Sequence, residues 1–96
     1  MIVHNVMFRL EGERAHELAV DFKAAIERLP SVIAELDSVS VRLDDGAIAG
    51  NWTLILVARC ADEAALAAYS AHPAHLDCVA IIKPAIAARA CVDYTE

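Results

Sequence analysis

Apolar and polar residues alternate with a period of two along four segments of the chain, which is the pattern of β-strands. The four predicted strands cover residues 2–10, 38–43, 52–60 and 88–94. One face of the first strand carries Ile2, His4, Val6, Phe8 and Leu10. The third strand is apolar on both faces, so we expect both of them to be covered in the folded protein.

Helical spacing appears between these strands. Leu18, Phe22 and Ile26 recur at intervals of four residues, which predicts an amphipathic helix that ends near Pro30. Residues 62–71 form a second, alanine-rich helix. His72-Pro73 interrupts it, because the residue before a proline is pushed out of the helical region. Pro73 suits the first position of a further helix, which we expect to run to about residue 87.

The order strand, helix, strand, strand, helix pair, strand predicts a single α+β domain over residues 1–96. This order is the ferredoxin-like βαββαβ arrangement, a four-stranded antiparallel sheet with its helices on one face. The first and third strands would be central. The other face of the sheet, which includes Val3 and Met7, then needs cover from a second subunit's sheet. We therefore predict a homodimer whose two sheets enclose an apolar lumen.

Composition supports an oligomer and excludes several classes of function. Hydrophobic residues make up 58% of the chain, above the roughly 45–50% of an ordinary globular protein. The net charge of −6 offers no basic face for nucleic acid. No uncharged run approaches the roughly 20 residues that a membrane span requires. The N-terminus lacks the basic segment of a signal peptide, so we expect a cytoplasmic protein.

Few residues outside the histidines suggest chemistry. Cys60, Cys78 and Cys91 form no CxxC pair, and we interpret them as small buried apolar residues. No glycine-rich phosphate loop is present, so we expect no nucleotide or other cofactor. Arg59 and Arg89 are candidates for binding an anionic substituent, although each more simply borders a strand or pairs with an acid.

The tetrapeptide His72-Pro73-Ala74-His75 is the most informative segment. With Pro73 at the first helical position, His72 becomes the N-cap, and His75 lies one turn into the helix. The positive end of the helix dipole there favours a neutral imidazole, the form that a general base needs. Tyr69 precedes the motif. His4 points toward His75 if the helices cover its face of the first strand.

Two other interpretations of these residues stay open. His72 and His75 can be plain capping groups, and Tyr69 can be a core aromatic residue. Alternatively, His72 and His75 with His4 or Asp77 could supply metal ligands. We predict no metal site, because the spacing is not HExxH and Pro73 makes the two histidines diverge.

At this point the chain resembles the stress-responsive dimeric α+β barrel (Dabb) domain family. The resemblance covers nearly the whole chain, including residues 2–8, 61–66 and 92–94, and its most specific element is Tyr-x-x-His-Pro-x-His over residues 69–75. It implies a ferredoxin-like protomer and a dimer whose sheets form a barrel. In a plant polyketide cyclase of this family, the Tyr and second His of the motif act on a polyketide in a pocket between sheet and helices. The resemblance places those roles on Tyr69 and His75, with His4 beside them.

Three hypotheses for function follow. The first is a homodimer that binds a small apolar molecule in a pocket between sheet and helices. The predicted ligand-binding residues are Val6, Phe8 and His72. The second is a cofactor-free cyclase or lyase in which His75 removes a proton alpha to a carbonyl, Tyr69 hydrogen-bonds the developing enolate, and His4 orients His75. The third is a non-catalytic, stress-related dimer in which the same residues cap helices and fill the core.

Overall fold

The computed structural model describes all 96 residues, folded as one sheet and three helices. The elements follow in the order β1 (Ile2–Leu10), α1 (Ala15–Ile26), β2 (Leu36–Leu43), β3 (Leu54–Cys60), α2 (Glu63–Ala71), α3 (Pro73–Ile82) and β4 (Ile86–Thr95). Short 3₁₀ turns lie at Leu29–Ser31 and Lys83–Ala85. This order confirms the predicted ferredoxin-like fold.

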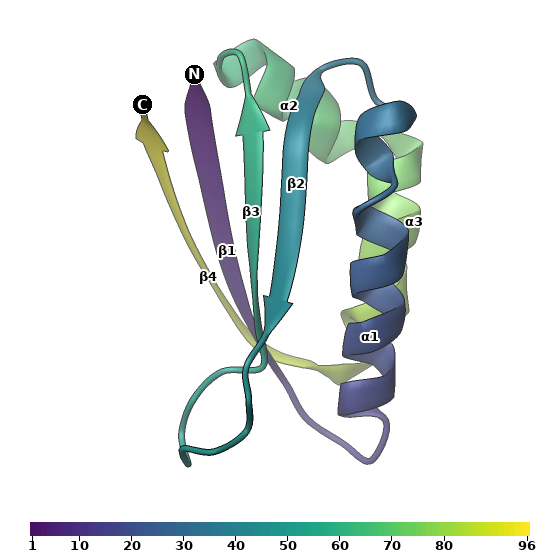
Figure 1. Cartoon of the computed structure of the whole chain (residues 1–96). Coiled ribbons are helices and arrows are strands. Elements are labelled where there is room, and N and C mark those ends of the chain that lie inside the picture. Colours follow the sequence, from purple (N-terminus) through teal and green to yellow (C-terminus); the bar gives the residue numbers. More distant parts are fainter.

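The sheet is antiparallel throughout, with the strand order β2-β3-β1-β4. The central position of β1 and β3 agrees with the prediction. His4 of β1 lies opposite Ala58 on β3 and Asp93 on β4, so these three residues share one face of the sheet. All three helices pack on that face, and the two chain termini lie at the same end of the sheet (Figure 1).

The core lies between the sheet and the helices. Eighteen buried residues form one contiguous cluster, to which α1 contributes Phe22 and Ile26 as its helical spacing predicted. The rings of Phe8 on β1 and Phe22 pack edge to face, with centroids 6.1 Å apart. This contact joins α1 to the face of β1 that carries the candidate site.

Several predicted boundaries are wrong, among them the start of β2, which lies at Leu36 instead of residue 38. The last helix ends at Ile82 instead of continuing to about residue 87, because Pro84 has no backbone N–H to bond back along a helix. As a result β4 begins at Ile86, two residues earlier than predicted. Trp52 precedes β3, which starts only at Leu54. Gly50, with φ of +90°, lies in a turn within the loop that precedes β3.

The other face of the sheet has no helix on it (Figure 1). Large apolar side chains are exposed there, namely Met7, Ile55, Val92 and Tyr94. Val3, which was also expected to need a partner, is already fully buried within the chain. None of the three helices has the length and apolar character needed to cross a lipid bilayer.

Candidate functional site

A cavity of about 130 Å³ lies between the sheet and the helices. Its walls come from β1, β3, β4 and all three helices. The lining residues are His4, Val6, Phe8, Phe22, Leu56, Tyr69, Ser70, His75, Val79 and Arg89. Five of the six residues predicted from the sequence are among them, and the sixth, His72, is not. The cavity is therefore a mostly apolar space with a few polar groups from different elements.

The corner between α2 and α3 places Tyr69 and His75 on this cavity. The Asp62 side chain accepts a hydrogen bond from the Ala65 N–H at 2.8 Å and so caps the start of α2. Pro73 then opens α3, with His72 as an extended residue between the two helices. Two consecutive helices at a sharp corner thus bring residues 69 and 75 together.

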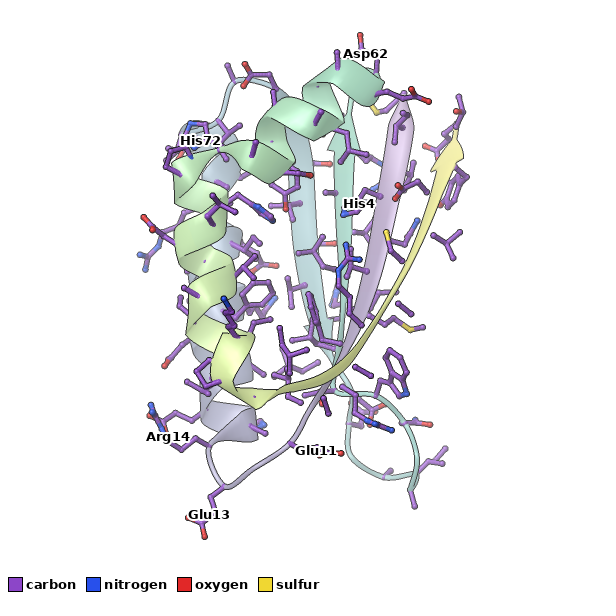
Figure 2. The ribbon with its side chains drawn as sticks, turned by 180° about the vertical axis from the view of Figure 1, so that it is seen from behind. His4, Glu11, Glu13, Arg14, Asp62 and His72 are labelled. Atoms are coloured by element: carbon purple, nitrogen blue, oxygen red, sulfur yellow. The ribbon has the colours of Figure 1, made fainter.

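His72 has a structural task at this corner. Its Nδ1 accepts a hydrogen bond from the Ala74 N–H at 3.0 Å, which is the N-cap predicted from the sequence. Figure 2 shows His72 at the turn between α2 and α3, well away from His4 on β1. The structure therefore does not bring His72 into the cavity, and its role there is to position the helix that carries His75.

One ring nitrogen of His75 is hydrogen-bonded, and the other has no hydrogen-bond partner in the protein. Its Nδ1 lies 2.9 Å from the Ser70 carbonyl oxygen. Because a carbonyl can only accept, Nδ1 carries the proton, and Nε2 of the neutral ring keeps its lone pair. Burial lowers the pKa of His75. The hydrogen bond to the Ser70 carbonyl opposes this shift, and electrostatic interactions with His4 and Arg89 add to it. Burial thus favours the neutral form of His75.

Tyr69 is the most deeply buried polar side chain of the site. It is only 1% exposed, and its hydroxyl has no hydrogen-bond partner in the protein. Burial raises the pKa of Tyr69 far above its usual range, so the hydroxyl keeps its proton and is available as a donor. The rings of Tyr69 and His75 are 4.5 Å apart at 54°. The two side chains therefore lie side by side.

His4 reaches the cavity from the sheet, and its partner is Asp93. The distance from His4 Nδ1 to Asp93 Oδ1 is 2.5 Å, and no hydrogen bond joins His4 to His75. Burial alone would raise the pKa of Asp93, but hydrogen bonds from His4 and from the Cys91 thiol hold it below its ordinary value. The expectation that His4 orients His75 is therefore wrong: Ser70 holds His75, and Asp93 holds His4.

Asp93 was not among the residues predicted from the sequence, and Cys91 is not buried as predicted. Cys60 and Cys78 are buried as expected, but Cys91 is exposed and lies 3.4 Å from Asp93 Oδ1. Arg89, Cys91 and Asp93 alternate along β4 and so share its helix-facing side. That period of two was visible in the sequence. It could not show that Asp93 pairs with His4, since this depends on the register between strands that are about 90 positions apart.

The metal-ligand set considered from the sequence is not assembled. His72, His75 and Asp77 belong to no cluster of potential ligands, and the cluster that contains His4 is completed by Cys91 and Asp93.

Comparison with known proteins now decides the family. The family model of the Stress responsive A/B Barrel Domain, Dabb, matches residues 2–96. The chain belongs to the Dabb family. No match was found among curated protein sequences.

Solved structures extend this result to the fold and assembly of similar proteins. A ferredoxin-like protein from Thermobifida fusca, described as dimeric and of unknown function, is 32% identical with a TM-score of 0.85, over 99% of this Dabb chain and 90% of that chain. A dimeric protein of unknown function from Bacteroides fragilis is 27% identical with a TM-score of 0.92, over 99% and 95% of the two chains. A hydroxynitrile lyase from Passiflora edulis, 16% identical, has the same fold, with a TM-score of 0.79 over 97% and 90%.

Proposed function

We propose that this Dabb protein is a homodimer that binds a small, mostly apolar carbonyl compound in the cavity between its sheet and helices. One observation carries the proposal, namely the Tyr69 hydroxyl, which is buried on an apolar cavity without a partner. A buried hydroxyl without a hydrogen bond costs about 1–3 kcal/mol, so a ligand oxygen that accepts from it recovers that cost. A carbonyl oxygen is such an acceptor.

The size of the cavity limits the ligand. An apolar cavity of about 150 Å³ is enough to bind benzene. The 130 Å³ here therefore suits the buried part of a molecule, with about five or six heavy atoms. Val6, Phe8 and Leu56 supply its apolar walls. Arg89 also lines the cavity and forms no ion pair, so its guanidinium group can pair with an anionic substituent on the ligand.

The neutral His75 favours a second, catalytic function. With the ligand's carbonyl oxygen on the Tyr69 hydroxyl, the adjacent Nε2 of His75 takes a proton from the carbon alpha to the carbonyl. The electron pair of the C–H bond moves into the enolate, whose oxygen is stabilised by the Tyr69 O–H. Return of the proton from Nε2 completes the cycle without a cofactor. The relation to a hydroxynitrile lyase supports only the point that this fold accommodates a lyase.

The homodimer is supported by the uncovered face of the sheet. Met7, Ile55, Val92 and Tyr94 expose large apolar surfaces there, and a hollow of about 460 Å³ lies over the end of this face, beside Trp52. A monomer would leave this area in water. The similar proteins from T. fusca and B. fragilis are both dimeric.

Binding is tested with two probes of the same shape, cyclohexanone and methylenecyclohexane, which differ in the carbonyl oxygen. The ratio of their dissociation constants is measured by NMR titration for the native protein and for Tyr69→Phe. Loss of one neutral hydrogen bond, about 0.5–1.5 kcal/mol, should shift this ratio about two- to twelvefold against the ketone. An unchanged ratio would mean that Tyr69 does not bind the carbonyl.

Catalysis is tested by exchange of the alpha protons of cyclohexanone in D₂O. The native protein should accelerate exchange over buffer, and His75→Gln should abolish the acceleration while the ketone still binds. If the native protein binds the ketone without accelerating exchange, the site is a binding site only. If His75→Gln lowers stability but leaves both the ligand affinity and the acceleration of exchange within a few fold of the native protein, His75 has a purely structural role.

A further inference from the structure

Three side chains with metal-ligating atoms meet on the helix-facing side of β1 and β4. They are His4, Cys91 and Asp93, and one ligand atom of each lies within 4.8 Å of the other two. The Cys91 Sγ atom is 3.5 Å from His4 Nδ1 and 3.4 Å from Asp93 Oδ1. The remaining distance, from His4 Nδ1 to Asp93 Oδ1, is 2.5 Å.

These distances are close to those of a tetrahedral zinc site. Zinc binds His nitrogen, Cys sulfur and carboxylate oxygen at about 2.0–2.1, 2.3 and 2.0–2.2 Å, so neighbouring ligand atoms are about 3.3–3.6 Å apart. Both distances to the Cys91 sulfur already fall in this range. The His4–Asp93 hydrogen bond has to open by roughly 0.8 Å, as an ion replaces the shared proton. A small rotation of the exposed Asp93 carboxylate provides this.

The backbone holds the three ligands in place. His4 and Asp93 are direct neighbours across the β1–β4 pair, and Cys91 lies two residues before Asp93 on the same face. The His4 side chain is only 12% exposed, whereas that of Asp93 is 44% exposed. The site therefore has a buried wall and an open side through which an ion can enter.

The charges and donor types also suit a divalent ion. Binding of the ion releases the proton of the Cys91 thiol to solvent, and the resulting thiolate and the Asp93 carboxylate bring two negative charges, which match one zinc-like ion. A mixed sulfur, nitrogen and oxygen set favours zinc over magnesium or calcium. Arg89 is on the same face, opposite Phe8, and its charge acts on both Cys91 and Asp93. It favours the deprotonated forms of these two ligands and at the same time weakens their attraction for a cation.

We propose that His4, Cys91 and Asp93 form a binding site for a zinc-type divalent cation. Three protein ligands leave a fourth position for water or a ligand atom. Because His4 also lines the cavity, the ion would sit beside the proposed carbonyl site. The proposal replaces the expectation of a metal-free protein, and it does not depend on the roles of Tyr69 and His75.

The test uses untagged, chelator-treated protein titrated with Zn²⁺ and Co²⁺. We expect one ion per chain and, with Co²⁺, a thiolate-to-cobalt charge-transfer band together with the intense visible bands of tetrahedral cobalt. Cys91→Ala and Asp93→Asn should each weaken binding about tenfold or more. Both side chains are exposed, so these variants should fold, and circular dichroism checks this.

Two matched controls separate the site from adventitious binding. Cys78→Ala removes a core thiol, and His16→Gln removes an exposed histidine on α1, so neither should change the affinity. Binding without a thiolate band, binding that survives Cys91→Ala, or the absence of stoichiometric binding would overturn the proposal. His75→Gln should leave metal binding intact. A negative result here leaves the ketone experiments, which report on Tyr69 and His75, unaffected.

Discussion

Removing the Tyr69 hydroxyl should stabilise the free protein while it impairs the site. Tyr69→Phe keeps the ring and its contact with His75 but deletes a buried group that has no partner. The cost of such a group is about 1–3 kcal/mol, and the adjoining cavity can relieve part of it. We therefore expect a gain of about 1 kcal/mol in the free energy of unfolding. In a domain of this length, that is a rise of about 4–8 °C in Tm.

Urea unfolding at a fixed protein concentration measures this gain, because the midpoint should rise while the slope stays constant. Thr95→Val is the control for loss of a hydroxyl. Thr95 is exposed and lies on the helix-facing side of β4, away from the proposed dimer interface, so removal of its hydroxyl should change stability little. A loss of stability in Tyr69→Phe, of about 1 kcal/mol, would show that the hydroxyl is already hydrogen-bonded in the free protein. The main argument for a ligand oxygen at Tyr69 would then fail.

Three further predictions concern the base, the interface and the corner. Because burial lowers the pKa of His75 below its ordinary 6.5, the unfolded chain takes up a proton at His75 before the folded protein does as the pH falls. Stability should therefore fall as the pH drops below about 6.5, and His75→Gln should flatten that part of the unfolding curve measured between about pH 5 and 8. Val92→Glu should yield monomers in light scattering, whereas Val32→Glu, on a comparably exposed apolar residue away from the sheet, should leave the dimer intact. His72→Ala should cost about 1 kcal/mol in thermal unfolding and His72→Asn much less, because asparagine is also a good N-cap.

Local sequence patterns were sufficient to predict most of the fold. The period of two in β1 and the four-residue spacing of Phe22 and Ile26 in α1 each reflect which side of an element is buried, and burial by the core enforces both patterns. The boundary near Pro84 was harder, because the apolar residues of α3 continue past it into β4. Hydrophobicity alone does not show where a helix ends when the next element is also apolar.

Part of the candidate site could be predicted from neighbouring residues in the sequence, and part depends on contacts between distant segments. Tyr69, His72 and His75 lie within seven residues, so the capping role of His72 and the position of His75 one turn into α3 could be predicted from Pro73. The pairing of His4 with Asp93 is a property of strand register. A one-residue shift of β4 would turn Asp93 and Cys91 to the opposite face of the sheet, and no local pattern excludes that shift.

The two polar systems of the cavity are therefore structurally separable. Tyr69 and His75 depend on the α2–α3 corner, whose geometry is set by Pro73 and the His72 cap. His4 depends on the exposed edge strand β4, where a side chain can change without repacking the core. Substitutions at Cys91 or Asp93 can therefore change the surroundings of His4 while leaving Tyr69 and His75 in place.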